Sequence, residues 1–201
     1  AWVDGTYEVL ADSGFASELQ GLLQDAKDRL EGAAFATGNT GATQPRGIVA
    51  AVAAVTASIV ASGTTNALVA GDVYAVANAL RARDAAEASW LASKPTYNRI
   101  RQFDTSGGSA FWANLGMGVP SNLLGQPAYE SSSMQTAVTT GGLVLLAGNF
   151  KQYVIVDRVG MSVQYNPMLI GLTTGRPTGK AGWLAFWRVG ADVVDPAAFR
   201  L

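Results

Sequence analysis

The 201-residue sequence predicts an α+β fold in which helices come early in the chain and short strands come late. The first observation is an amphipathic helical pattern over residues 14–36. The second is a change after Phe111, from which short apolar runs of β-type composition alternate with turns. The sequence shows no internal repeat and no low-complexity linker, and its length suits one domain or two small interlocked ones.

Residues 14–36 form the clearest predicted element. Apolar residues recur there at steps of three and four, the mark of an amphipathic helix. The pattern consists of Phe15, Leu19, Leu22, Leu23, Ala26, Leu30 and Ala33. Asp12 and Ser13 offer an N-cap, and Gly38 offers a C-terminal stop. At about 1.5 Å per residue the helix is roughly 34 Å long, which is long for a chain of this size.

The middle of the chain predicts two further helices and one strand. An Ala/Val stretch reaching about Ala61 is of undetermined type. A helix is expected over 72–83, with Val69, Val73, Val76 and Leu80 on its apolar face. Residues 88–92, around Trp90, are typical of a short buried strand. Pro95 suits the first position of a third helix, which ends near a turn at 104–108.

The last third predicts strands at 143–147, 153–156 and 183–194. The last of these alternates with a period of two, which favours one buried face. Its apolar positions are Trp183, Ala185, Trp187, Val189, Ala191 and Val193. The other positions begin with Leu184 and Phe186, so the early part is expected to be buried on both faces or to lie in an interface. Pro196 ends the ladder because it lacks a donor.

Two missing residue types limit the chemistry that this chain performs. The sequence contains no His and no Cys. This excludes Ser-His-Asp and Cys-His nucleophilic sites, imidazole acid–base chemistry, zinc fingers, iron–sulfur clusters and disulfides. Carboxylate, Lys, Tyr and Ser chemistry remain, and no catalytic, cofactor-binding or metal site is assigned.

The surface is expected to carry little charge. Charged residues make up 14% of the chain, against about 25% in typical domains. The 14 basic and 15 acidic residues leave a net charge of −1 with no basic tract, so tight phosphate binding is not expected. An exterior rich in Ala, Gly and Val suits a protein covered by copies of itself. A high-GC coding bias is the alternative explanation, because it also raises the content of Ala, Gly and Val. The longest apolar run, 47–55, is too short to span a bilayer.

Four other patterns have a functional and a structural interpretation. Gly171, Gly175 and Gly179-Lys180 hint at a phosphate loop, but the spacing departs from that motif and Ala181 follows the lysine, so a simple loop is favoured. Asp157 and Arg158 could be a catalytic carboxylate with its partner, but neighbours in a strand point to opposite faces, which favours separate surface or interface roles.

Asp25, Asp28 and Glu31 have helical spacing that suits a solvated face better than a metal site. The five Trp residues are interpreted as packing in the core and in subunit contacts rather than as a sugar-binding cleft.

Five segments, in order and spacing, resemble the major capsid protein family of tailed bacteriophages, first known from phage Hong Kong 97. One departure is Asn149, where the family usually has Asp. The segments are the 15–35 helix continued through Phe35-Ala36-Thr37-Gly38 to Gln44-Pro45-Arg46-Gly47-Ile48; Ala88-Ser89-Trp90-Leu91-Ala92-Ser93 with Pro95-Thr96 and Asp104; Leu123-Leu124-Gly125-Gln126-Pro127; 148–158; and 188–199.

The resemblance implies a Hong Kong 97-type capsid fold, with a long spine helix, a peripheral-domain sheet and a mixed axial domain. Residues 1–48 and 186–201 would form the peripheral domain, and 49–185 the axial domain. The family's N-terminal arm and extended loop have no counterpart in this sequence, so a truncation at the N-terminus is expected. The final strand would return to the long helix and place Trp187 near Leu22, Leu23 and Leu30.

The implied function is structural. Copies of the subunit would form pentamers and hexamers that enclose a double-stranded DNA genome in an icosahedral shell. Expected partners are copies of itself, with scaffold, portal and packaged DNA bound without sequence specificity, and no membrane. The expected location is the virion capsid, assembled in the bacterial host cytoplasm. Two alternatives stay open: an encapsulin-type nanocompartment shell and a carboxylate-dependent enzyme.

Overall fold

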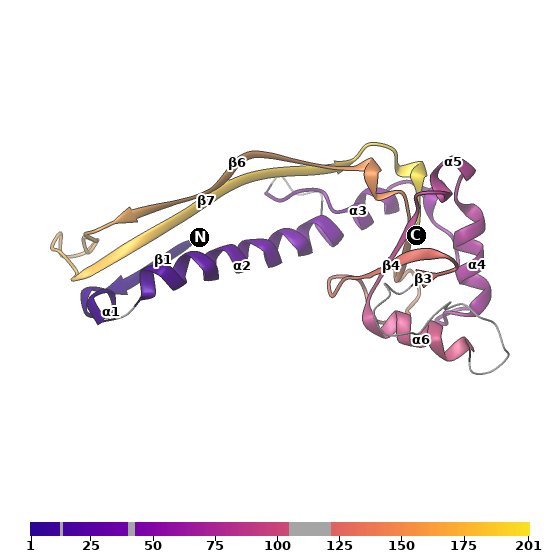
Figure 1. The fold of residues 1–201 in the computed structure, drawn as a ribbon, viewed down its shortest axis with the longest axis horizontal. Helices are drawn as coiled ribbons and strands as arrows, with labels where there is room; N and C mark the ends of the chain where they lie inside the picture. Colours follow the sequence, from indigo (N-terminus) through magenta and orange to yellow (C-terminus); the bar gives the residue numbers. More distant parts are fainter. Residues whose placement is uncertain (13, 40–42, 105–121) are drawn as a thin grey trace. The chain divides into compact units, whose positions relative to one another are not determined.

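The computed structural model describes residues 1–12, 14–39, 43–104 and 122–201 (Figure 1). These residues divide into two compact units, and the chain contributes two segments to each. The first unit contains Ala1–Gly32 and Val156–Gly190. The second unit contains Ala33–Ile155 and Ala191–Leu201. The expected division into peripheral and axial domains concerns positions in a shell and stays a prediction.

The first unit is built on a three-stranded antiparallel sheet with the order β1-β7-β6. Its strands are β1 (Trp2–Thr6), β6 (Tyr153–Asn166) and β7 (Lys180–Val193). In the register between β1 and β7, Trp2 lies opposite Leu184 and Thr6 lies opposite Lys180. The predicted strand at 183–194 is confirmed, and the one predicted at 153–156 extends to Asn166.

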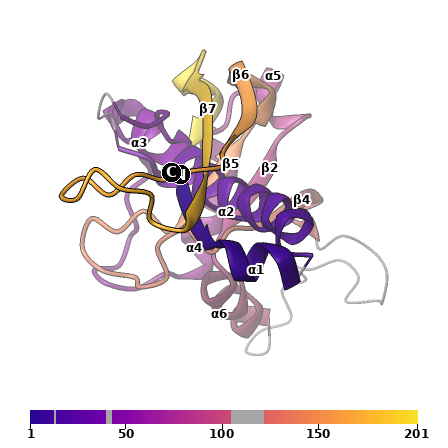
Figure 2. The same ribbon diagram turned by 90° about the vertical axis from the view of Figure 1, so that its left-hand side faces the viewer.

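Two helices accompany this sheet, α1 (Tyr7–Asp12) and α2 (Phe15–Thr37), and they can be followed beside β7 in Figure 2. The long helix predicted over 14–36 is therefore confirmed. Leu19 and Leu23 are buried, and both pack in the first unit's core. That core is formed by Leu19, Leu23, Ala181, Trp183 and Ala185, with Val3, Leu10, Phe15 and Met161 packed against them. The expected cover of the final strand by the long helix is thus correct for its early part.

Two details of that expectation are wrong. Leu22 is 62% exposed and Leu30 is 60% exposed, so neither belongs to the buried core. With 3.6 residues per turn, Leu22 lies about 100° around the helix from Leu23, outside the sector that the sheet covers. The outward positions Leu184 and Phe186 are 40% and 42% exposed in the single chain. Of the two alternatives expected for the early part of β7, burial on both faces is therefore excluded, and a position in an interface stays a prediction.

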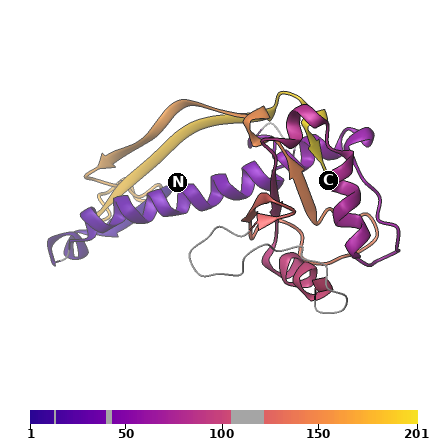
Figure 3. The same cartoon turned by 45° about the vertical axis from the view of Figure 1, so that its right-hand side comes forward.

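The second unit contains a five-stranded mixed sheet with the order β3-β4-β2-β5-β8. Strand β2 is parallel to β4 and antiparallel to β5. Strand β5 also pairs with the C-terminal strand, and the two are the orange and yellow arrows near the label C in Figure 3. The strands predicted at 88–92 and 143–147 are confirmed with shifted ends. The bounds are β2 (Ser89–Ala92), β3 (Asn122–Leu123), β4 (Gln126–Glu130), β5 (Leu145–Gly148) and β8 (Phe199–Arg200).

Short helices surround this sheet. The helix predicted over 72–83 is two helices, because Leu80 and Arg81 both adopt an extended backbone with ψ near 140°. Leu80 turns toward the core there. Of the turn expected at 104–108, residues 105–108 lie outside the described residues. The α-helices are α3 (Ile48–Ala53), α4 (Ala70–Ala79), α5 (Ala82–Ala85) and α6 (Lys94–Asp104), and the 3₁₀ helices are η1 (Thr56–Ser58), η2 (Phe150–Gln152) and η3 (Pro196–Ala198).

The core of the second unit has two clusters on its sheet. Trp90 and Ile100 lie in one cluster, and Phe199 and Leu146 lie in the other, each at most 2% exposed. Strand β7 ends at Val193, three residues before Pro196, so the missing donor of Pro196 is not what ends the strand. Pro196 starts η3 instead, and Phe199 then brings the C-terminal residues into the core. No helix among the described ranges is long and apolar enough to cross a membrane.

Candidate functional site

The glycines that hinted at a phosphate loop form the turn between β6 and β7. The amide of Gly171 donates to the carbonyl of Arg176 (3.0 Å), and the amide of Gly175 donates to the carbonyl of Gly171 (2.9 Å). Gly175 and Gly179 have φ of 62° and 71°, which favours glycine. The Lys180 ammonium lies 2.8 Å from the Asp4 carboxylate. Because these groups already bond within the hairpin or with the neighbouring strand β1, the structure supports the interpretation as a turn.

The three carboxylates of α2 that could suggest a metal site each have a partner. Asp25 pairs with Arg29 at 2.7 Å, and Glu31 pairs with Lys27 at 2.9 Å. Asp28 accepts a 2.8 Å hydrogen bond from Gln24. Within the described part of the chain, no three carboxylates gather as a metal site requires.

Asp157 and Arg158 are exposed neighbours in β6. Strand alternation points their side chains to opposite faces of the sheet, so they do not form a catalytic pair.

The tryptophans are distributed over both units rather than along one cleft. Trp90 is buried in the second unit. In the first unit, Trp183 packs edge-on against Phe15 with ring centroids 5.7 Å apart, whereas Trp2 is 50% exposed. Trp187 is half-buried, and Trp112 lies outside the described residues. Trp2 is thus the most exposed of the four described tryptophans, and sequence patterning alone did not single it out.

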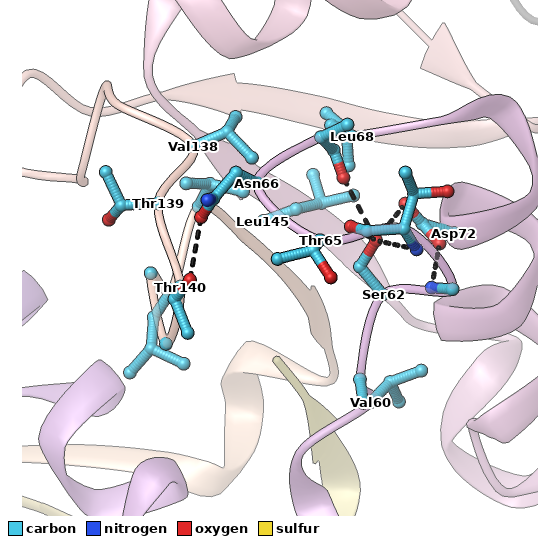
Figure 4. A pocket seen from close by; sticks show the side chains of 18 of the residues that line it. Val60, Ser62, Thr65, Asn66, Leu68, Asp72, Val138, Thr139, Thr140 and Leu145 are labelled. Atoms are coloured by element: carbon cyan, nitrogen blue, oxygen red, sulfur yellow. Dashed lines mark hydrogen bonds between the residues drawn. The ribbon is translucent and has the colours of Figure 1, made fainter.

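A pocket of about 400 Å³ lies in the second unit, between the loops 59–68 and 138–145 and helix α4 (Figure 4). Asp72 is the one ionisable side chain among its described lining residues. Its carboxylate accepts hydrogen bonds from Ser62 Oγ (2.9 Å) and from the amides of Gly63 (3.1 Å) and Val69 (2.9 Å). Asp72 therefore shapes the loop and caps α4, and the pocket offers no acid–base pair.

A charged cluster joins the C-terminal segment to α5 within the second unit. Asp195 lies 2.6 Å from Arg81 and 2.8 Å from Arg83, and Arg81 also pairs with Asp84 at 2.7 Å. The hydrogen bond from Arg81, assisted by the charge of Arg83, holds the pKa of the Asp195 carboxyl below its ordinary value. The cluster is neutral by formal charge, so it tethers chain segments rather than binding an ion.

Asn149, the departure from the family pattern, uses both ends of its amide. Its oxygen accepts from the amide of Lys151 (3.0 Å), and its nitrogen donates to Glu87 (3.3 Å). The Lys151 ammonium also contacts Glu87 at 2.7 Å, and this hydrogen bond lowers the pKa of the Glu87 carboxyl. An aspartate at 149 would lack the donor toward Glu87.

The most distinctive surface is the side of the first unit's sheet that faces away from its core. Trp183 and Ala185 point into the core, so the alternate residues Leu184 and Phe186 point outward. Trp2 lies opposite Leu184 and therefore shares that face. We call this surface the outer sheet face. It consists of Trp2, Val156, Leu184 and Phe186, which are 40–59% exposed, with the exposed side chains of Arg158 and Arg188 beside them.

A second exposed apolar surface lies along α2. Leu22, Ala26 and Leu30 follow each other at steps of four, so they form a continuous stripe on the helix. We call these three residues the helix stripe. Glu18 and Asp25 lie one turn before and after Leu22 and border the stripe with acidic side chains.

Comparison with known proteins gives a consistent result. The model of the Phage capsid family matches residues 1–201, whereas no curated protein matches the chain. The solved capsid of an empty GTA particle with C5 symmetry is similar over all of this chain and 70% of that chain, with a TM-score of 0.79 and 25% identity.

Two less similar structures share the fold over all of this chain. One is from Gordonia phage Cozz (TM-score 0.64, 16% identity, 67% of that chain covered). The other is the holo-SrpI encapsulin complex from Synechococcus elongatus PCC 7942 (TM-score 0.68, 15% identity, 70% of that chain covered).

Proposed function

Because this chain belongs to the phage capsid family and has the predicted Hong Kong 97-type fold, we propose that copies of the chain assemble into a closed shell. The function of the chain is then to make contacts between subunits. The chain is a major capsid structural protein. The structural observation that supports the proposal is the outer sheet face, where Trp2, Leu184 and Phe186 are exposed side by side. Exposed aromatic and aliphatic clusters of this kind mark protein–protein contact sites.

The finer proposal concerns the assembly. Copies would form pentamers and hexamers in an icosahedral shell around double-stranded DNA, assembled in the bacterial host cytoplasm. The C5 symmetry of the similar GTA capsid supports a ring of five. Scaffold and portal proteins would be further partners. Packaged DNA would be enclosed without sequence-specific binding, in line with a net charge of −1.

The placement of the two units in the shell is also a proposal. The family resemblance assigned 1–48 and 186–201 to the periphery and 49–185 to the capsomer axis. The pairing of β6 with β7 favours moving 156–185 to the peripheral part, because these residues share a sheet with β1. The second unit, with its mixed sheet, would then supply the axial part.

An encapsulin-type shell is the second candidate, since the SrpI encapsulin has the same fold. At 15% identity this likeness shows the fold alone. Electron microscopy of the natural gene product from its bacterial host tests both candidates. We expect closed icosahedral shells that hold nuclease-protected DNA. Shells filled with a protein cargo would favour the encapsulin, and the absence of any shell would contradict both.

A further inference from the structure

The first unit exposes apolar side chains on two different surfaces, and this needs an explanation beyond its own folding. The outer sheet face lies on the side of the sheet opposite the core formed by Leu19, Leu23 and Trp183. The helix stripe borders that core on α2, but Leu22 and Leu30 are both at least 60% exposed. Neither surface is covered by another element of the described chain, and side chains of this size gain free energy when a partner covers them.

We propose that these two surfaces are the two halves of one contact: the outer sheet face of one copy packs on the helix stripe of the next copy. The proposal rests on the proposed function and deepens it by naming the residues that meet. A ring of five or six identical subunits requires a head-to-tail contact, in which two different surfaces of the chain meet. A surface that binds only the same surface on another copy forms a dimer, and that contact adds no third copy.

Charge complementarity selects the helix as the partner of the sheet. Helices α1 and α2 of the first unit carry five described acidic side chains against two basic ones: Glu8, Glu18, Asp25, Asp28 and Glu31, against Lys27 and Arg29. The sheet and its hairpin have the opposite balance, with a small excess of basic side chains. Four basic side chains stand against three acidic ones: Arg158, Arg176, Lys180 and Arg188, against Asp4, Asp157 and Asp192.

Two of these cations are available for a contact between copies. Lys180 is already paired with Asp4, whereas Arg158 and Arg188 have no ion-pair partner among the described residues and lie on the outer sheet face. On the acidic border of the helix stripe, Asp25 is already paired with Arg29, whereas Glu18 has no ion-pair partner among the described residues and supplies the matching charge. Opposite potentials on two apolar surfaces orient the partners and disfavour sheet-to-sheet pairing, which would bring like charges together.

The test uses thiol cross-linking of the natural gene product. Because the described chain has no Cys, each variant adds one thiol to it. Leu22→Cys places the thiol on the helix stripe and Phe186→Cys on the outer sheet face; both side chains are exposed, so folding should be retained. One variant carries a size tag, the two are mixed, and a short bis-maleimide linker is added. We expect a tagged–untagged product in excess of both homodimers.

Tyr129→Cys is the matched control, because Tyr129 is 58% exposed but lies in the second unit. Its product with Phe186→Cys should be weaker than that of Leu22→Cys. An excess of Phe186→Cys homodimer, or no gain over the Tyr129 control, overturns the contact. Closed shells seen by microscopy in the same samples would then leave the capsid role intact, whereas no shell and no cross-link would overturn both.

The charge match has its own readout. Adding Arg188→Glu to the Phe186→Cys chain should reduce the product with Leu22→Cys, and rising salt should reduce the wild-type product in the same direction. An unchanged yield in both measurements overturns the choice of the acidic helix as the partner surface.

Discussion

The two units of this capsid chain divide its apolar residues in opposite ways. The second unit holds 23 of the 28 buried apolar residues in the described chain, so it completes its own core. The first unit is smaller, yet it holds 14 of the 21 large apolar residues that are exposed. The second unit is therefore built mainly for its own stability, and the first unit for contact with a partner.

Strand geometry explains the difference. All four residues of β5 are buried, because alternate residues of the strand pack in the two core clusters of the second unit. In β7, residues 183–186 alternate between buried and exposed, because α2 covers only one face. A sheet that is covered on one face leaves its other face either to solvent or to a partner. The exposed side chains of Trp2, Leu184 and Phe186 indicate a partner on that second face.

The largest effect is expected when a buried aromatic side chain is truncated in the second unit, which completes its own core. Trp90 is 2% exposed in the larger core cluster. We expect Trp90→Ala to lower the free energy of unfolding by about 4–5 kcal/mol, the upper range for a truncated core aromatic. Urea denaturation followed by circular dichroism measures it. Tyr129→Ala in the adjacent strand is the control and should change the value by about 0.5 kcal/mol or less.

A slightly smaller effect is expected in the first unit. Trp183 is 7% exposed and contacts Phe15 and Tyr165, but its core has few members. Trp183→Ala should cost about 3 kcal/mol and should raise hydrogen exchange in α2 and β7 while β5 stays protected. Phe186→Ala, on the opposite face, should leave exchange in the isolated subunit nearly unchanged. Equal loss of protection in both units would show that they fold as one and would end the comparison.

The turn of the hairpin offers a local test. Gly175 has φ of 62°, and its added Cβ would meet no atom within 4 Å, so backbone conformation alone opposes a side chain there. Gly175→Ala should therefore cost about 1 kcal/mol. Gly160→Ala in β6 also meets open space but lacks the positive φ, so it should be close to neutral. Similar losses for both variants in thermal melts would contradict this account.

The smallest expected effect concerns the C-terminal tether. Asp195 has a pKa below its ordinary value because of Arg81, so its contribution to stability is present above pH about 4 and lost as pH falls through the lowered pKa. Asp195→Asn should reduce stability at pH 7 by less than about 1 kcal/mol, because the pair is partly exposed. The difference from wild type should shrink toward pH 3 in urea titrations; a difference that grows there would refute the assignment.

The sequence predicted those elements whose signal is local. The helix over 14–36 and the strand at 183–194 show clear periodicity, and both are present. The length of β6 was not predictable, because Asp157, Arg158 and Gly160 interrupt its apolar run and its extended form depends on pairing with β7.

Long-range contacts were equally hidden from the sequence. The ion pair of Arg81 with Asp195 joins residues 114 positions apart. The sequence predicted only part of the outer sheet face. Alternation in the strand predicts that Leu184 and Phe186 share one face, whereas Trp2 joins them only through the register between β1 and β7.

The order of the segments along the chain has a consequence for biosynthesis. Residues 156–190, which complete the first unit, leave the ribosome before residues 196–201, whose Phe199 and Leu201 fill the core of the second unit. Domains generally form as their residues emerge during translation. All segments of the first unit are therefore synthesised before the residues that complete the core of the second unit.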